Sequence, residues 1–340
     1  MMIYKDMYRK NIVFMPLLLA VLMALMTSCV REDEGDCGVT VRFFYTHNIL
    51  SANTLKNQVD EVSLYVFDED GILVRQHTNI TTQLFNNFIV RLTDLKSGNY
   101  QLVAWAQSKH IMSDQSYFSI SELKTGVSSI DELTYVMKRG EASGFQQHEL
   151  NNFLVGMTDV VIEDGGSSVT VELKKVTNKI RVVIFSYTSG SMLDVEDFEF
   201  SVVDKAGNGH INYDYTLLPD KQIIYLPYYA ANLNPEDDGA LSQNEIDKAV
   251  VVEINTSRLF VKNASRLRIF DKKEGKEIVS INLPWLFSLT EMEDNKKWSL
   301  QEYLDRQDKY TIMLFFNDST FMNSTIIING WVVNIKDINL

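Results

Sequence analysis

The chain has 340 residues, 45 of them acidic and 32 basic, and its formal net charge at pH 7 is −13. Nucleic-acid phosphates require clusters of Lys and Arg, and no basic run occurs here, so we expect no nucleic-acid partner. Hydrophobic residues make up 45% of the sequence, which is enough for sizeable cores. The length suggests two domains.

Residues 1–28 have the layout of a secretory signal peptide. Three basic residues precede an apolar stretch over 12–26, and small residues precede Cys29. The apolar stretch is shorter than the about 20 residues that a membrane-spanning helix needs. A cysteine directly after the signal predicts a lipoprotein that begins at Cys29 and is held by acyl chains there. A chance cysteine after an ordinary secretion signal and a permanent membrane helix are the alternatives.

Residues 29–38 form a short acidic tether. Glu32, Asp33 and Glu34 closely follow Cys29. Charge runs usually form solvated connections, but acidic residues at this place also resemble the surface-export signal of Bacteroidota lipoproteins. We therefore expect a protein of the outer membrane, attached to its lipid through acylated Cys29 and displayed on the cell surface. Because residues 1–28 carry +2, the lipidated chain would carry −15.

The second cysteine of the chain, Cys37, lies at the end of this tether. With Cys29 lipidated, no disulfide can form within the chain. Cys37 is then a free thiol, which we favour, or it pairs between molecules. The folded body must be stabilised by packing alone.

The remaining sequence has the pattern of an all-β protein. Short apolar runs alternate with period two, are rich in β-branched and aromatic residues, and are separated by turn residues. The spacing favours β-sandwiches over a parallel sheet. The expected strands are 39–45, 62–67, 72–76, 88–92, 100–106, 152–155, 160–162, 169–173, 179–185, 198–203, 222–226, 250–254, 266–270, 278–283, 310–316 and 325–335.

Local signals predict several turns and two helical starts. An acidic turn closed by Gly71 and a charged turn closed by Gly275 each join two strands, and the segment 203–208 has a similar form. The pairs Ser129–Glu132 and Ser299–Glu302 have capping-box spacing, and the second predicts a short helix through Leu304. Similarity between 98–106 and 308–316 suggests an internal repeat.

The expected organisation is a signal peptide (1–28), the lipidated tether (29–38), an N-terminal sandwich (39–176) and a C-terminal sandwich (177–340). The boundary is placed near 174–178, where one strand ends and the next begins. The segment 229–247 is polar and contains Gly and Pro, so it predicts an exposed loop within the second sandwich.

The sequence contains no pattern that indicates catalysis. The five histidines are scattered, and neither a metal-ligand spacing, a nucleophile elbow nor a phosphate-binding loop occurs. The turn 68–71 lacks the ligands of a calcium loop, so a hairpin is favoured. We expect neither an enzyme nor a bound cofactor or metal.

Two weaker patterns remain open. Asp318 begins a short triplet that resembles an O-glycosylation site of Bacteroidota. Trp285, Trp298 and Trp331 could present sugar-binding surfaces, although aromatic residues in strands usually lie in the core.

In order and spacing, several segments together with the lipoprotein start resemble the FimB-type minor fimbrial subunits of Bacteroidales, the anchor proteins of type V pili. The matching segments are 29–45, 60–68, 98–107, 177–184, 255–259, 301–306 and 328–333.

This resemblance implies two tandem transthyretin-like β-sandwich domains. It also implies a lipid-anchored minor subunit at the base of a fimbrium, which attaches the pilus to the outer membrane and limits its length. The implied partner is the major fimbrial stalk subunit, bound by strand addition, in which an extended segment pairs with an open sheet edge. The alternatives are a surface glycan-binding lipoprotein, an accessory or tip fimbrial subunit, and a surface hydrolase.

Overall fold

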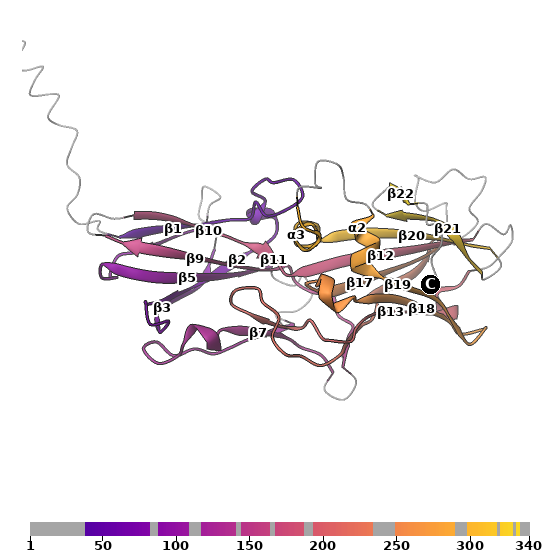
Figure 1. The fold of residues 1–340 in the computed structure, drawn as a ribbon, viewed down its shortest axis with the longest axis horizontal. Coiled ribbons are helices and arrows are strands. Elements are labelled where there is room, and N and C mark those ends of the chain that lie inside the picture. Colours follow the sequence, from indigo (N-terminus) through magenta and orange to yellow (C-terminus); the bar gives the residue numbers. More distant parts are fainter. Residues whose placement is uncertain are drawn as a thin grey trace, which may run out of the picture.

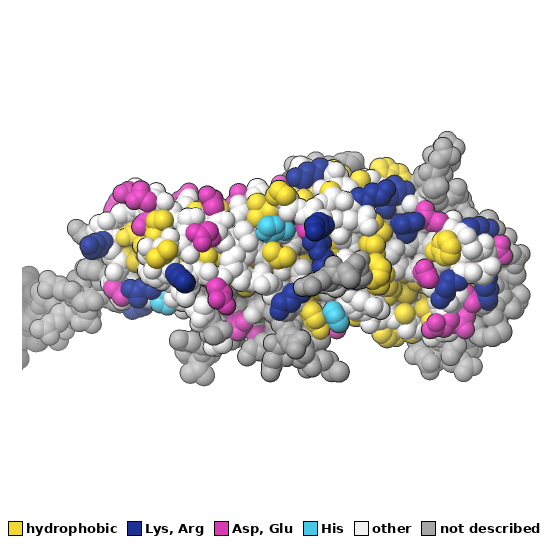
Figure 2. Space-filling view, turned by 90° about the horizontal axis from the view of Figure 1, so that it is seen from below, with side chains coloured by type: hydrophobic (Ala, Val, Ile, Leu, Met, Phe, Trp, Pro, Cys, Tyr) yellow, Lys and Arg dark blue, Asp and Glu magenta, His cyan; other side chains and the backbone are white. Residues whose placement is uncertain are grey.

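A computed structural model describes residues 38–81, 88–108, 117–140, 144–163, 167–186, 193–233, 249–289, 298–317, 320–328 and 331–333. These residues form an elongated body built almost entirely of β-strands, with the N-terminal sheets at one end and the C-terminal sheets at the other (Figure 1). Acidic, basic and apolar side chains are interspersed along the face seen from below (Figure 2).

The N-terminal sandwich consists of two sheets that face each other. The smaller sheet has the order β10–β1–β4. Its strands are β10 (Ser167–Glu172), β1 (Val39–Phe44) and β4 (Ile89–Leu92). The larger sheet has the order β11–β9–β5–β2–β3. Its strands are β11 (Lys174–Lys175), β9 (Phe153–Ile162), β5 (Gly98–Gln107), β2 (Glu61–Phe67) and β3 (Leu73–Ile80).

The larger N-terminal sheet is buried on both faces over part of its length, which in β5 runs from Leu102 to Ala106. Along β5, Leu102 and Ala104 pack toward the β1 sheet, whereas Val103 and Trp105 belong to a second core on the other side. Successive side chains of a strand point to opposite faces, so this run of buried residues requires a third layer. That layer is a sheet of order β14–β7–β6. Its strands are β14 (His210–Asn212), β7 (Thr134–Met137) and β6 (Phe118–Ile120).

The C-terminal sandwich also has two facing sheets. One has the order β16–β17–β12–β20–β21–β22. Its strands are β16 (Tyr229–Leu233), β17 (Ala249–Ser257), β12 (Thr177–Ser186), β20 (Lys309–Asn317), β21 (Thr320–Ile328) and β22 (Trp331–Val333). The other has the order β19–β18–β13–β15–β8. Its strands are β19 (Lys276–Asn282), β18 (Arg266–Asp271), β13 (Phe198–Asp204), β15 (Ile223–Tyr225) and β8 (Phe145–Gln146).

Helical segments are short and are capped by local side chains. Helix α2 (Leu283–Ser288) begins after Asn282, whose side chain accepts the Trp285 N–H, and helix α3 (Leu300–Arg306) begins after Ser299, which accepts the Glu302 N–H. The 3₁₀ turns are η2 (Leu55–Asn57), η3 (Ile130–Glu132), η4 (Val195–Asp197) and η5 (Val261–Asn263). Among the described residues, no helix is both long and apolar enough to cross a membrane.

The two sandwiches exchange strands across their junction. Strand β8, from the first half of the sequence, pairs with β15 at the edge of the C-terminal sheet. Strand β14, from the second half, pairs with β7 in the third N-terminal layer. One hydrophobic cluster therefore contains both Trp105 and Phe200 and runs through the junction. The two halves share a core rather than meeting at a surface.

The all-β prediction is confirmed, and so are the hairpin turns. Gly71 and Gly275 have φ of +74° and +66° and close the β2–β3 and β18–β19 hairpins. The segment 203–208 is not a hairpin, because β14 pairs with β7 instead of returning along β13. The transthyretin-like description and the domain boundaries stay predictions.

Several expected strand limits are corrected. The segments 152–155 and 160–162 are one strand, β9, and the expected strand 325–335 is divided between β21 and β22. The segment 229–247 is not entirely a loop: residues 229–233 form β16, which pairs with β17, and the rest lies outside the described residues. Strands β6, β7 and β14 were not expected, because each has only three or four residues, and β14 also has its partner far away in the sequence.

The buried hydrogen bond between Tyr135 and Ser257 joins β7 to β17, with 2.7 Å between the two hydroxyl oxygens. Replacement Tyr135→Phe leaves the Ser257 hydroxyl buried without this partner. We expect the free energy of unfolding, measured by urea denaturation, to fall by about 1–3 kcal/mol. The matched variant Tyr100→Phe removes an exposed hydroxyl bond to the Lys96 carbonyl and should change it by less than about 0.5 kcal/mol. An equal loss of unfolding free energy in the two variants would contradict the claim that the Tyr135–Ser257 bond helps to hold the halves together.

Candidate functional site at the junction of the two sandwiches

The residues predicted from the sequence to carry the anchor lie outside the described residues. These are Cys29, Glu32, Asp33, Glu34 and also Cys37. The described chain begins at Gly38, and β1 starts at the next residue. The tether therefore enters the folded body through β1, which makes the position of this strand central to any anchoring role.

Strand β1 is the central strand of its sheet. All six of its residues pair in parallel with β10, and residues 39–42 pair antiparallel with β4. Val39, Val41 and Phe43 point into the core, each at most 2% exposed. A force applied to the N-terminus acts along the strand, whereas the ladder hydrogen bonds run across it. Both ladders are then loaded together in shear.

The partner strand β10 leads directly into the C-terminal sandwich. It is followed by β11 and then by β12, which lies in the middle of the six-stranded sheet (Figure 1). There β12 pairs antiparallel with β17 along nine residues and parallel with β20 along eight. Because β1 and β10 are parallel, pulling β1 from its start and β10 from its end shears their ladder. The segment 167–186 thus connects the cores of both sandwiches.

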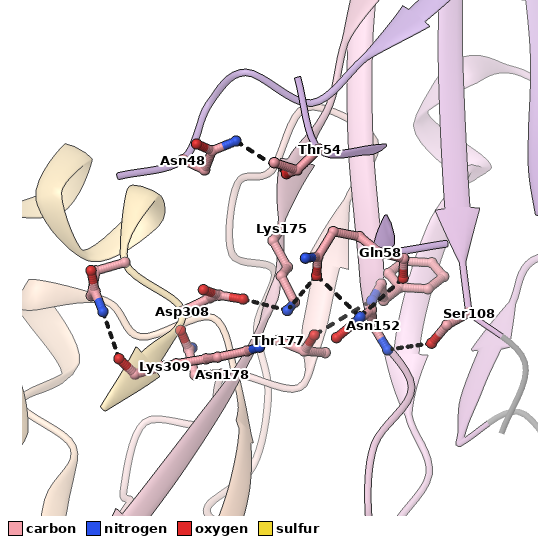
Figure 3. A network of polar contacts seen from close by, with 12 residues as sticks. Asn48, Thr54, Gln58, Ser108, Asn152, Lys175, Thr177, Asn178, Asp308 and Lys309 are labelled. Atoms are coloured by element: carbon pink, nitrogen blue, oxygen red, sulfur yellow. Dashed lines mark hydrogen bonds and ion pairs between the residues drawn. The ribbon is translucent and has the colours of Figure 1, made fainter. Parts of the chain in front are cut away.

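A buried ion pair lies where this segment crosses the junction. The ammonium group of Lys175, whose side chain is 4% exposed, contacts the carboxylate of Asp308. It also lies 3.4 Å from the amide oxygen of Gln58 (Figure 3). Burial lowers the pKa of Lys175, and Asp308 offsets part of this effect. The pair joins β11 to the residue before β20 and brings in the loop after η2.

Side-chain amides surround this ion pair. Asn152 donates 2.9 Å hydrogen bonds from its backbone to Ser108 and from its side chain to the Gln58 carbonyl (Figure 3). Asn255 accepts the Leu150 N–H at 3.1 Å and donates to the Asn178 carbonyl at 3.0 Å. Buried polar groups need such partners, and each bond has a directional requirement. The network therefore fixes how the loop 149–152 sits against β12 and β17.

A second ion pair fixes helix α3 against the end of β17. Arg258 forms a bidentate pair with Asp305, with N–O distances of 2.7 and 2.6 Å, and the side chains are only 15% and 9% exposed. Gln301 donates to both Asp305 and the Leu259 carbonyl. The segments 255–259 and 301–306, which were singled out in the sequence separately, meet here. Nothing in the sequence pairs Arg258 with Asp305.

The end of β1 reaches the same region. His47, which follows β1, is 7% exposed, and its Nε2 atom has no hydrogen-bond partner among the described residues. Burial first, and then the positive charges of Lys174 and Arg306, lower the pKa of His47 to about 4. Its imidazole is therefore neutral near pH 7. The N-terminal strand thus ends beside α3 and β11, close to the parts that join the sandwiches.

The described residues contain no cluster of three or more His, Cys, Asp or Glu side chains able to hold a metal ion. The ion pairs and most of the amide groups of the junction bond to one another or to the backbone, and so they hold backbone segments of both sandwiches in fixed positions.

A family model for fimbrillin-A associated anchor proteins Mfa1 and Mfa2 matches residues 32–337. The chain belongs to this family. Its members are fimbrial anchor proteins, a structural and non-enzymatic class associated with fimbrillin at the cell surface. The match spans both sandwiches and the junction between them, so the resemblance to fimbrial anchor subunits is confirmed.

Solved structures agree with the family fold. A Bacteroides thetaiotaomicron protein provisionally named as polysaccharide binding has 31% identity and a TM-score of 0.74, covering 88% of this chain and 99% of its own. A B. thetaiotaomicron protein provisionally named as an adhesin has 27% identity and a TM-score of 0.75, covering 88% and 98%. The fimbrial anchor protein Mfa2 from Porphyromonas gingivalis has the same fold, with 19% identity, a TM-score of 0.62 and coverage of 87% and 98%. No curated protein matches the chain.

Replacement Arg258→Ala would leave the Asp305 carboxylate nearly buried without its counterion. We expect the free energy of unfolding to fall by about 3–5 kcal/mol, because removing one partner of a buried pair leaves an uncompensated charge. Arg268 is the matched control, since it is 50% exposed and pairs with Glu277 on the surface. Arg268→Ala should cost less than about 1 kcal/mol. Urea denaturation of both variants measures this, and similar values would argue against a special role for Arg258.

The low pKa of His47 predicts a pH dependence of stability. The ordinary pKa is 6.5 and the folded value is about 4, so the unfolded chain binds the proton more readily between these values. Stability is fully present above about pH 6.5 and falls as the pH drops, by roughly 3 kcal/mol at pH 4. Replacement His47→Gln removes this part of the slope. The free energy of unfolding of both proteins is measured at several pH values from 7 to 4. It should fall more steeply with decreasing pH in the unchanged protein than in the variant, and an equal fall in both would refute the assignment.

Proposed function

We propose that this protein is a lipid-anchored minor subunit that attaches a fimbrium to the outer membrane. In this proposal residues 1–28 are removed as a signal peptide and Cys29 carries the lipid. Glu32, Asp33 and Glu34 direct the protein to the outer surface. The observation that carries the proposal is the position of β1: the strand that follows the tether lies between two other strands, with its alternate side chains in the core.

The arrangement of strands suits a protein that transmits tension. Load entering through the C-terminal sandwich passes along β12, β11 and β10, and reaches β1 as shear across a six-residue parallel ladder. The β4 ladder and the buried side chains of β1 oppose the same movement. Release of β1 under force depends on the rate of unfolding. Loading in shear requires many contacts to break together in one step, which raises the barrier and keeps this rate low. A strand pulled perpendicular to itself would instead lose its ladder bonds one at a time.

The proposed partner is the major stalk subunit of the fimbrium, bound by strand addition. In this mode an extended segment of one subunit satisfies the open edge of another. The groove between β10 and β4 is already filled by β1, so no incoming strand can use it while β1 stays in place. A subunit with its own strand retained and its tether fixed in the membrane would end the polymer, which supports a role in limiting fimbrial length.

Glycan binding is a second proposed function. The relative provisionally named as polysaccharide binding shares 31% of its residues with this chain over 88% of the length. Of the tryptophans considered for sugar binding, Trp285 is 38% exposed, and Trp298 lies against the Arg306 guanidinium, 4.5 Å from its ring centre. A polar hollow at the junction offers a different kind of site.

Replacement Cys29→Ala tests the anchoring proposal. We expect the protein to move from the membrane fraction to the medium, because two or three acyl chains are needed for stable attachment. Fimbriae should then be found detached. The control Cys37→Ala removes the other thiol and should leave both the membrane fraction and the filaments unchanged. Retention of the Cys29→Ala protein in washed membranes would exclude lipid anchoring at this residue.

A further inference from the structure

The junction contains a polar hollow with a volume of about 460 Å³. It is bordered by the loop after η2, by the residues before β9, and by β11, β12, β17 and β20. Both sandwiches thus contribute to its wall. Its size lies within the range of small-molecule sites, about 300–1,000 Å³. Its lining is unusually rich in carboxamide and ammonium groups, which suits a polar ligand.

One lining group lacks the partner that its burial demands. Asn151 is only 7% exposed, and its side-chain NH₂ donates to the Ser108 carbonyl. Its Oδ1 atom has no hydrogen-bond partner among the described residues. The neighbouring amides of Asn152 and Asn255 bond to the backbone. A buried acceptor without a partner costs about 1–3 kcal/mol. A turn of the Asn151 side chain toward the hollow would let a ligand hydroxyl or N–H group become that partner.

The hollow is lined by four lysines and by two acidic residues, Asp60 and Glu149. Lys175 and Lys179 line it but are paired with Asp308 and Glu149. Lys56 and Lys309 also line it, are exposed, and form no ion pair with any residue that the structure describes. In a chain with a net charge of −13, two unpaired ammonium groups beside one hollow make a local site for a negative group.

We propose that this hollow binds a saccharide unit that carries a carboxylate, such as a uronic acid. Its hydroxyl groups would donate to Asn151 and exchange hydrogen bonds with the amides, and its carboxylate would face Lys56 and Lys309. A small inorganic anion would fill only a fraction of the volume, and an apolar ligand would leave Asn151 unpaired. The inference rests on the second proposed function, glycan binding, and assigns it a site and a ligand class.

The test is calorimetric titration of the purified protein with a short oligogalacturonate, with a neutral galactose oligomer and a glutamate oligopeptide as comparison ligands. The double variant Lys56→Glu/Lys309→Glu should bind oligogalacturonate at least about tenfold more weakly. The control double variant Lys96→Glu/Lys124→Glu makes the same charge change at exposed positions outside the hollow and should bind as the unchanged protein does. Asn151→Ala should weaken binding as well, and the melting temperature of this variant reports whether it folds. If it does not fold, the lysine variants alone test the site.

We expect the protein to bind oligogalacturonate more tightly than both comparison ligands. Of the two double variants, only the Lys56/Lys309 variant should lose this binding. Oligogalacturonate binding that survives this variant would overturn the site but leave glycan binding in place. Absence of binding to either saccharide would overturn the ligand class and remove support for glycan binding. Equal binding of the glutamate oligopeptide would show a general anion site and overturn the saccharide assignment.

Discussion

The parallel pairing of β1 with β10 is the interaction on which the rest of the structure depends. It places the first strand of the folded chain inside a sheet, with its apolar side chains covered by β2 and β5. It also aligns that strand with the segment that continues through β11 into the centre of the C-terminal sheet. Without this pairing, the tether would lead to a loose end instead of to both cores.

The junction combines an apolar core with a rim of directional polar contacts. The shared hydrophobic cluster resists separation of the sandwiches, but apolar contact alone permits rotation and sliding. The Lys175–Asp308 and Arg258–Asp305 pairs and the surrounding amides require particular geometries and so limit that movement. An anchor benefits from having both kinds of contact, because the two sandwiches then keep one orientation while they carry load. The polar network is incomplete at buried atoms among the described residues of this region, which include His47 Nε2 and, beside the hollow, Asn151 Oδ1.

Sequence patterns predicted the long strands well and the short ones poorly. The alternation along Val39–Phe44 and the continuous apolar run in β12 are local signals, and both strands were expected. Strand β8 has two residues, which is too short for any periodicity, and it exists only because β15 lies beside it. Helix α3 was expected from the Ser299 cap, whereas the contact of its Asp305 with Arg258 depends on residues 47 positions apart.

The sequence by itself determined the β-strand character, the glycine-closed hairpins and the helix caps, because these depend on neighbouring residues and on backbone conformations that few residue types adopt. It also placed the cysteine and the acidic residues of the tether directly before the first strand. Only the tertiary structure decided that β1 and β10 run parallel, that β8 and β14 cross between the sandwiches, and that Lys175, Asp308 and Asn151 surround one junction. These features join residues far apart in the chain, and their energies depend on packing and burial that no local pattern contains.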